Sequence, residues 1–306
     1  MLSHDQKTAI QKAIQESIGY SPSFDRIEVT TNFQRFPTAK KESLDGYFIV
    51  SQFGKFTTCH FGDWKQHISG YWEDGQQRGT ILSEKEREDI RKEYQEEQRQ
   101  EEERRIRTIE KHRRFFDSLP YADSIGVIHP YLMKKCILKS YVAKYNSLEG
   151  TLLFPFMDYR GAFRGYESIS ITGQKKIAKD SMKKGSFCVL DPDCDKSSIF
   201  YACEGYATGI SILEASKAQV IVCIDAGNLT EGIRSASQYL KISPEKVVIV
   251  ADNDNSRTGE IEAHKACSVL GCRYVLTPIE GMDSNDFACC YGLSALTRFL
   301  EGARKA

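Results

Sequence analysis

The last third of the chain alternates short apolar runs with segments of helical periodicity. Four runs are short, rich in β-branched residues and bounded by turn residues: Ile199–Cys203, Val220–Asp225, Lys246–Ala251 and Tyr274–Thr277. Three segments between them repeat apolar residues at helical spacing: Ala207–Ser216, Thr230–Leu240 and Glu260–Leu270. Strands that alternate with helices in this way predict a parallel sheet covered by helices, and therefore an α/β fold.

Two other parts of the chain carry weaker patterns. Strand signals occupy Thr151–Met157 and Ala162–Ile171, which predicts a small α+β subdomain ahead of the parallel sheet. Near the N-terminus, Gln6–Ile18 has a helical period and Gly46–His60 alternates like a strand. An aromatic turn is expected at Phe61–Trp64, so the N-terminal region is also predicted to be α+β.

A long polar helix is predicted between these parts. Residues 84–114 hold eleven acidic and eleven basic side chains, with neither Gly nor Pro, and nearly their only apolar positions are Ile90, Tyr94, Ile106 and Ile109. A helix without a wide apolar stripe is expected to be a solvated spacer or a poorly packed linker. The predicted organisation is an accessory domain at 1–83, a helical linker at 84–118, a basic subdomain at 119–197 and an α/β domain at 198–306.

Composition narrows the protein class. Hydrophobic residues make up 41% and charged residues 27% of the chain, with a formal net charge of zero, so any nucleic-acid site must be a local patch. Apolar runs stay well short of the roughly 20 residues of a membrane helix, and MLSHDQKTAI does not look like a signal peptide. A cytoplasmic protein without membrane contact is expected.

The ten cysteines suggest reduced thiols rather than a disulfide framework, because the chain contains no C-x-x-C pair. Cys59 and His60 with His67 form a weak alternative, a fragment of a zinc site.

Carboxylates follow the predicted strands where each strand ends. Glu204 comes directly after the first run, Asp252 and Asp254 follow the third, and Asp283 and Asp286 follow the fourth. The carboxyl ends of parallel strands meet at one edge of a sheet, and the two acids of a D-x-D spacing leave an extended backbone on the same side, about 7 Å apart. Hard cations prefer such oxygen ligands, so the sequence predicts a site for Mg²⁺ or Mn²⁺.

A single acid after a strand is more often a turn former or a helix cap. The combination of Glu204, Asp252, Asp254 and Asp286 at successive strand ends favours function over that simpler explanation. Asp225 also follows a strand. It is expected either to line the rim of the site behind the metal ligands or to cap the next helix, and the two interpretations remain equal.

A basic patch precedes the parallel sheet. Between Asp158 and Lys184 there are seven basic residues against three acidic ones, with aromatic residues among them. The basic residues are Arg160, Arg164, Lys175, Lys176, Lys179, Lys183 and Lys184. Such a mixture suits a single strand of nucleic acid, with phosphates on the cations and bases on the rings. The alternative is an ordinary solvated surface over core aromatics.

These motifs together resemble the toprim domain of bacterial-type DNA primases, in particular the short primases of phages, plasmids and mobile elements. The resemblance is carried by Glu204-Gly205, by Asp252-Asn253-Asp254 and by Asp283-Ser284-Asn285-Asp286. The upstream segment LLFPFMDYRGAFRGYESIS and the element Lys183-Lys184-Gly185 are similar to the part of the primase core that precedes toprim. A shorter likeness, Phe61–Lys65, links the N-terminal region to an accessory region of plasmid-borne primases.

The resemblance implies Mg²⁺-dependent synthesis of short RNA primers from ribonucleoside triphosphates on a single-stranded DNA template. By the same likeness Arg164, Lys176 and Lys184 would contact the template or the incoming nucleotide. Glu204 would either complete the metal site or assist proton transfer. The zinc module of cellular primases and the phosphate-binding motif G-x-x-x-x-G-K-[ST] are both missing from this sequence, so a replicative helicase would be a separate partner.

Two other functions share most of these residues. A toprim nuclease would use water in place of a 3′-hydroxyl at the same carboxylates. A non-catalytic adaptor for single-stranded DNA would keep the fold without the reaction. The basic segment favours a primase over a nuclease, and the intact set of mutually repelling carboxylates favours an enzyme over an adaptor.

Overall fold

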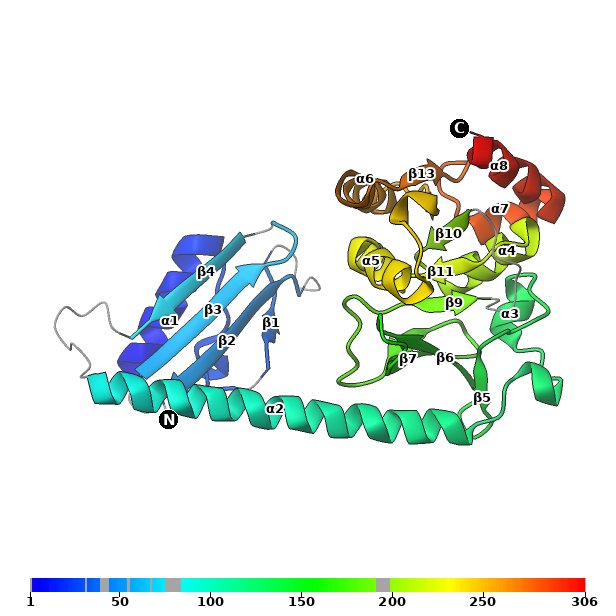
Figure 1. Cartoon of the computed structure of the whole chain (residues 1–306). Coiled ribbons are helices and arrows are strands. Elements are labelled where there is room, and N and C mark those ends of the chain that lie inside the picture. The colour runs from blue at the N-terminus through cyan, green and yellow to red at the C-terminus, as the bar shows by residue number, and fades with distance from the viewer. Residues whose placement is uncertain are drawn as a thin grey trace. The chain divides into compact units, whose positions relative to one another are not determined.

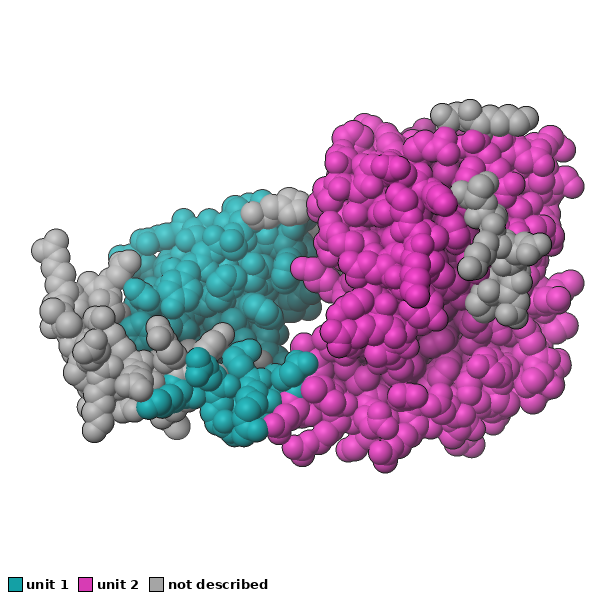
Figure 2. All heavy atoms as spheres, in the orientation of Figure 1, with its two compact units in different colours: residues 1–102 teal, residues 103–306 magenta. Residues whose placement is uncertain are grey.

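The computed structural model describes residues 2–30, 32–38, 44–53, 56–66, 68–74, 84–190 and 199–305. The chain divides into two compact units, residues 1–102 and 103–306, shown in different colours in Figure 2. Helix α2 (Glu84–Ser118) runs through the division between them (Figure 1). None of the helices in the described part of the chain is long and apolar enough to cross a membrane.

The first unit is a four-stranded antiparallel sheet with a helix on one face. Its elements are α1 (His4–Ile18), the short helix η1 (Phe24–Arg26), β1 (Gln34–Phe36), β2 (Gly46–Phe53), β3 (Phe56–Asp63) and β4 (Ile68–Glu73), and the strand order is β1-β2-β3-β4. Ser3 and Gln6 form a capping box that starts α1, and the helix buries Ile10, Ile14 and Ile18 against the sheet. The predicted helix and strand-forming region are therefore both present.

Two predictions for this unit are corrected by strand β3. Phe61, Gly62 and Asp63 are the last residues of β3 rather than an aromatic turn, and the turn begins at Trp64. Alternation along β3 buries Cys59 in the core and leaves His60 exposed on the other face. These neighbours cannot share a zinc ion, and His67 lies outside the described residues.

The second unit contains the predicted sheet. Its strands are β9 (Cys188–Leu190), β10 (Phe200–Cys203), β11 (Val220–Val222), β12 (Val247–Ala251) and β13 (Arg273–Leu276), in the order β13-β12-β10-β11-β9. Strands β10 to β13 are parallel, as expected, whereas the edge strand β9 is antiparallel and was not predicted. All five residues of β12 are buried, which is typical of a strand covered on both faces.

Helices cover both faces of this sheet (Figure 1). They are α4 (Tyr206–Ser216), α5 (Leu229–Leu240), α6 (Thr258–Leu270), α7 (Ser284–Tyr291) and α8 (Leu293–Lys305), with short helices η3 (Ala226–Asn228) and η4 (Pro244–Lys246). Helices α4, α7 and α8 share a core with Val248 and Val250, while α5 and α6 share a second core with Ile249. Neighbouring residues of β12 thus point into different cores, as a pleated strand requires.

A second antiparallel sheet precedes the parallel one in the same unit. It contains β5 (Lys144–Asn146), β6 (Thr151–Met157), β7 (Phe163–Ile169) and β8 (Lys175–Ile177), in that order, after η2 (Asp123–Ile125) and α3 (Pro130–Lys134). The predicted strands at 151–157 and 162–171 are confirmed and pair with each other as antiparallel neighbours. Phe154 of β6 stacks on the buried Tyr206 of α4, with ring centroids 4.3 Å apart, so both sheets contribute to one hydrophobic core.

The last turns of α2 pack onto this second sheet. Ile109 and Phe116 are buried, the Phe116 ring lies 5.7 Å from that of Phe163, and Arg104 pairs with Asp180 at 2.7 Å. The prediction of a solvated spacer is therefore wrong for residues 104–116. It missed the contribution of Phe116, which lies just beyond the polar run. The domain boundaries at 83, 118 and 197 stay predictions.

Candidate functional site

Two carboxylates lie side by side at the carboxyl end of the central strands. Glu204 follows β10 and Asp252 follows β12, its hydrogen-bonded parallel neighbour. Glu204 Oε1 and Asp252 Oδ1 are both buried, and neither has a hydrogen-bond partner among the described residues. A buried ionised oxygen without a partner is costly, so this pair is suited to a ligand that supplies positive charge.

Gly259 in the first turn of α6 allows this arrangement. A Cβ atom at Gly259 would lie 2.8 Å from both the Asp252 carbonyl oxygen and Glu204 Oε1, which is closer than such atoms approach. The helix therefore comes within contact distance of both acids only because residue 259 lacks a side chain.

Burial and mutual repulsion raise the pKa values of both acids. Burial, together with the charges of Asp252, Asp254 and Asp225, raises the pKa of Glu204 to about 8. Burial also raises the pKa of Asp252 to about 7, together with the charges of Asp283 and Asp254. Carboxylates in this state are stabilised by a nearby cation.

The predicted residues Asp283 and Asp286 have other partners in this structure. Asp283 is the N-cap of α7, and its side chain accepts a hydrogen bond of 2.7 Å from the Asp286 backbone N–H. Lys135, which follows α3, lies 2.9 Å from the Asp286 carboxylate and 3.8 Å from that of Asp283. Burial lowers the pKa of Lys135, but its hydrogen bond to Asp286 and the two acidic charges outweigh burial, and the pKa is raised.

Asn285 fixes Lys135 in this position. The Asn285 side chain is fully buried, and its amide donates to the Lys135 carbonyl at 2.8 Å and to Ser211 Oγ at 2.9 Å. In Asp283-Ser284-Asn285-Asp286 the first residue thus caps the helix, while the third and fourth hold a lysine from a segment about 150 residues earlier in the chain.

Asp225 also has a lysine partner. It precedes η3, but its side chain makes no capping hydrogen bond and the N-cap of α5 is Asn228, so the capping interpretation is not supported. Its side chain instead forms an ion pair with Lys183, and its role behind the metal ligands stays a prediction. Glu167 of β7 is nearly buried, and burial raises its pKa, with Lys175, Asp225 and Lys183 as the charges that act on it. Lys175 lies next to the turn after β10, because a Cβ atom added to Gly205 would be 3.5 Å from the Lys175 Nζ. Of the predicted basic residues, Lys175 and Lys183 are therefore the ones that lie near the carboxylates.

Asp254 is exposed beyond this pair and accepts a hydrogen bond of 2.8 Å from Ser256. No group of three acidic, histidine or cysteine side chains within the described ranges is arranged to hold a metal ion by itself. Mg²⁺ commonly binds proteins through one or two carboxylates and takes its remaining ligands from water and phosphates. The two partnerless oxygens of Glu204 and Asp252 fit that kind of site.

Residues 199–293 match the family model described as the Toprim domain. These residues are a toprim domain. The predicted match between its motifs and Glu204-Gly205, Asp252-x-Asp254 and Asp283–Asp286 falls within this range, while the basic subdomain lies outside it.

Solved structures with similarity to the chain include primase catalytic cores. The DnaG catalytic core is 15% identical over 60% of this chain and 71% of that one, with a TM-score of 0.40. The DnaG primase catalytic domain bound to single-stranded DNA is 14% identical over 56% and 59%, with a TM-score of 0.39. The primase fragment of the bacteriophage T7 primase-helicase protein is 15% identical over 60% and 75%, with a TM-score of 0.40.

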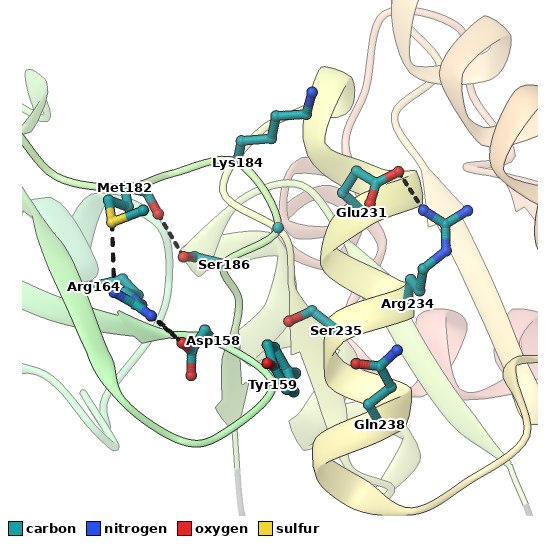
Figure 3. A pocket seen from close by; sticks show the side chains of 11 residues that line it. Asp158, Tyr159, Arg164, Met182, Lys184, Ser186, Glu231, Arg234, Ser235 and Gln238 are labelled. Atoms are coloured by element: carbon teal, nitrogen blue, oxygen red, sulfur yellow. Dashed lines mark hydrogen bonds and ion pairs between the residues drawn. The ribbon is translucent and has the colours of Figure 1, made fainter. Parts of the chain in front are cut away.

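The other predicted basic residues do not gather at the toprim carboxylates. Arg164 and Lys184 line a separate pocket of about 280 Å³ between the β6–β7 turn and α5 (Figure 3). Arg164 donates to Asp158 at 2.8 Å, and Arg160 donates to the Tyr159 hydroxyl at 2.7 Å. Lys176 and Lys179 are exposed on and after β8. The pocket also contains Arg234, Ser235 and Gln238 from α5.

Sequence reasoning missed three participants. Lys135 and Glu167 come from outside the toprim domain, and no spacing in the sequence connects either of them to the carboxylates. Gly259 stands one residue before the predicted helix Glu260–Leu270, where glycine is ordinary, so its close approach to both acids left no signal in the sequence.

Proposed function

We propose that this chain is a DNA primase that synthesises short RNA primers on single-stranded DNA, in the replication of a phage, plasmid or other mobile element. The observation that carries the proposal is the toprim domain in which one carboxylate oxygen of Glu204 and one of Asp252, at neighbouring strand ends, are buried without a hydrogen-bond partner among the described residues. Toprim-type nucleases share this feature. The basic segment 158–184, which supplies Lys175 and Lys183 to the same site, favours a polymerising enzyme.

Glu204 and Asp252 would hold Mg²⁺ or Mn²⁺, with Asp254 beside them and with Asp283 and Asp286 available once Lys135 releases them. When bound, the metal would neutralise the triphosphate and polarise the reacting phosphorus. Lys175, which is exposed, and Lys183, once it leaves its ion pair with Asp225, would bind phosphate oxygens, because both lie near the carboxylates. Alternatively, Glu204 would not hold the metal but would accept the proton of the attacking 3′-hydroxyl.

The proposed partners are a single-stranded DNA template, ribonucleoside triphosphates and a separate replicative helicase. The remaining basic residues, Arg160, Arg164, Lys176, Lys179 and Lys184, are proposed to bind template or nucleotide away from the carboxylates. A cytoplasmic location goes with this function and remains a prediction.

The test is to incubate the purified chain with single-stranded DNA, Mg²⁺ and labelled ribonucleotides, and to size the products. De novo oligonucleotides that disappear in the Asp252→Asn variant would support a primase. Shortened template would favour the nuclease, and template binding without any product would favour the adaptor.

A further inference from the structure

The open face of the N-terminal sheet carries a cluster of aromatic side chains. Helix α1 covers the opposite face, where Phe48, Val50 and Phe61 form the core with Ile10 and Ile14. On the open face lie Phe33, Tyr47, His60, Trp64 and Tyr71, together with the cation Arg35, and we call this set the aromatic face. Nothing in the reaction at the carboxylates requires it.

The rings of the aromatic face are in contact with one another. Tyr47 stacks on Trp64 with centroids 4.3 Å apart, and Phe33 meets Tyr47 edge-on at 5.3 Å. His60 lies parallel to Tyr47 at 6.2 Å, and Tyr71 stands opposite His60 in the β3–β4 register. Tyr47 is buried at the centre, so it fixes the positions of the rings around it.

Gly62 leaves room for the Tyr47 ring at the centre of the aromatic face. A Cβ atom at Gly62 would lie 2.4 Å from the Tyr47 hydroxyl oxygen, so the Tyr47 ring lies flat across β3 only because residue 62 has no side chain. The sheet thereby presents rings that lie along its surface.

The outer rings are left accessible. Phe33, Trp64 and Tyr71 are 51%, 52% and 58% exposed. Large aromatic residues exposed together on one sheet face usually mark a binding surface. The Arg35 guanidinium lies 5.8 Å from the centre of the Trp64 ring, and among the described strand residues of this face only Glu73 is acidic.

We propose that the aromatic face is a stacking surface for the bases of single-stranded nucleic acid. Exposed rings bind unpaired bases of any sequence, and a cation beside them binds the backbone. A duplex keeps its bases stacked on one another and offers no such contact. The proposal goes beyond the reaction, although the choice of DNA as the natural strand rests on the proposed function.

Tryptophan fluorescence gives a direct test, because the chain has only two tryptophans. Trp64 lies on the aromatic face, whereas Trp72 packs against the core. The full chain is titrated, without Mg²⁺, with a short single-stranded oligodeoxynucleotide and then with its duplex. We expect the single strand to quench the emission and the duplex to have little effect. In Trp64→Phe the quenching should disappear while affinity is largely kept, because a phenyl ring also stacks.

The alanine variants of Trp64, Tyr71 and Phe33 should each bind the single strand about fivefold to a hundredfold more weakly, the range expected when one base no longer stacks on a ring. The salt dependence of binding should not change, because none of these substitutions removes a positive charge. Tyr20→Ala is the matched control, since Tyr20 is an exposed ring that follows α1, the helix on the other face of the sheet. Melting temperatures check that each variant is folded.

Unchanged affinity in the three alanine variants would overturn the proposal, as would quenching of Trp64 by a proline-rich peptide but not by the oligonucleotide. Because binding is measured without Mg²⁺, the result is independent of catalysis. If single strands quench the Trp64 fluorescence but the chain makes no primer, only the proposed function is contradicted. A chain that makes primers without stacking would contradict this inference alone.

Discussion

Replacing Glu204 with glutamine should stabilise the metal-free protein while abolishing metal-dependent activity. The ionised Glu204 side chain is destabilised by burial and by the charges of Asp252 and Asp254. A pKa of about 8 instead of 4.5 corresponds to at most about 5 kcal/mol for the ionised form. The side chain is half-buried and Asp252 can take up a proton, which relieves part of that cost. We expect a gain of about 2 kcal/mol, or roughly 4–8 °C in melting temperature.

The gain should depend on pH in a defined direction. The folded-state pKa of Glu204 is raised above the unfolded value, so Glu204 costs the wild type no stability below about pH 4, where both states hold the proton. The cost of ionising Glu204 should grow as pH rises towards about 8 and then level off. Glu204→Gln removes this dependence, so the two proteins should differ most near pH 8.5 and far less near pH 5.

The assay is thermal and urea unfolding in EDTA at both pH values, with activity measured in Mg²⁺. Glu262→Gln serves as the control, because it removes a carboxylate of α6 that pairs with Lys265 at 3.2 Å, away from the partnerless pair. It should change stability by less than about 0.5 kcal/mol. Added Mg²⁺ should stabilise the wild type more than Glu204→Gln. If the glutamine variant is no more stable than the wild type at pH 8.5 in EDTA, the acids are not under electrostatic strain and the site assignment fails.

Three other predictions concern the surroundings of the site. Replacing Lys183 and Lys184 with alanine should weaken single-stranded DNA binding and lower the slope of log K against log salt by about 0.7 for every phosphate that the variant no longer binds. Lys241→Ala is the control, because Lys241 is an exposed lysine after α5, and it should leave the slope unchanged. An equal slope in both variants would contradict a role for Lys183 and Lys184. Asn285→Ala should lower the free energy of unfolding in urea by about 1–3 kcal/mol, because it leaves the Lys135 carbonyl and Ser211 without their hydrogen-bond donor. A variant as stable as the wild type would show that Lys135 is held in another way. A fragment that starts at Glu103 should fold and bind Mg²⁺. A fragment that starts at Phe115 should be less stable by about 1–3 kcal/mol, because it lacks Ile109 and the Arg104–Asp180 pair. Equal melting temperatures of the two fragments would mean that these residues contribute nothing to stability.

The order and type of the main elements could be predicted because local patterns determine them. Strand β12 was expected at Lys246–Ala251 and runs from Val247 to Ala251, and α4, α5 and α6 begin within two residues of their predicted starts. A fully buried strand needs a continuous apolar run, and a helix that covers a sheet needs an apolar stripe, so both leave a signal in a short window. The acidic ends of these strands could be predicted for the same reason, since the chain must turn immediately after each run.

The partners of those acids were decided by the tertiary structure alone. Lys135 reaches Asp286 across about 150 residues, and only the contact of the residue that follows α3 with helix α7 brings them together. The basic segment looked like one patch in the sequence, but Lys175 and Lys176 stand next to each other on β8 and so point to opposite faces. Which of them faces the site depends on how β8 pairs with β7 and how that sheet meets the toprim domain. Interactions of this kind depend on the closure of the whole fold, and a short window of sequence does not contain them.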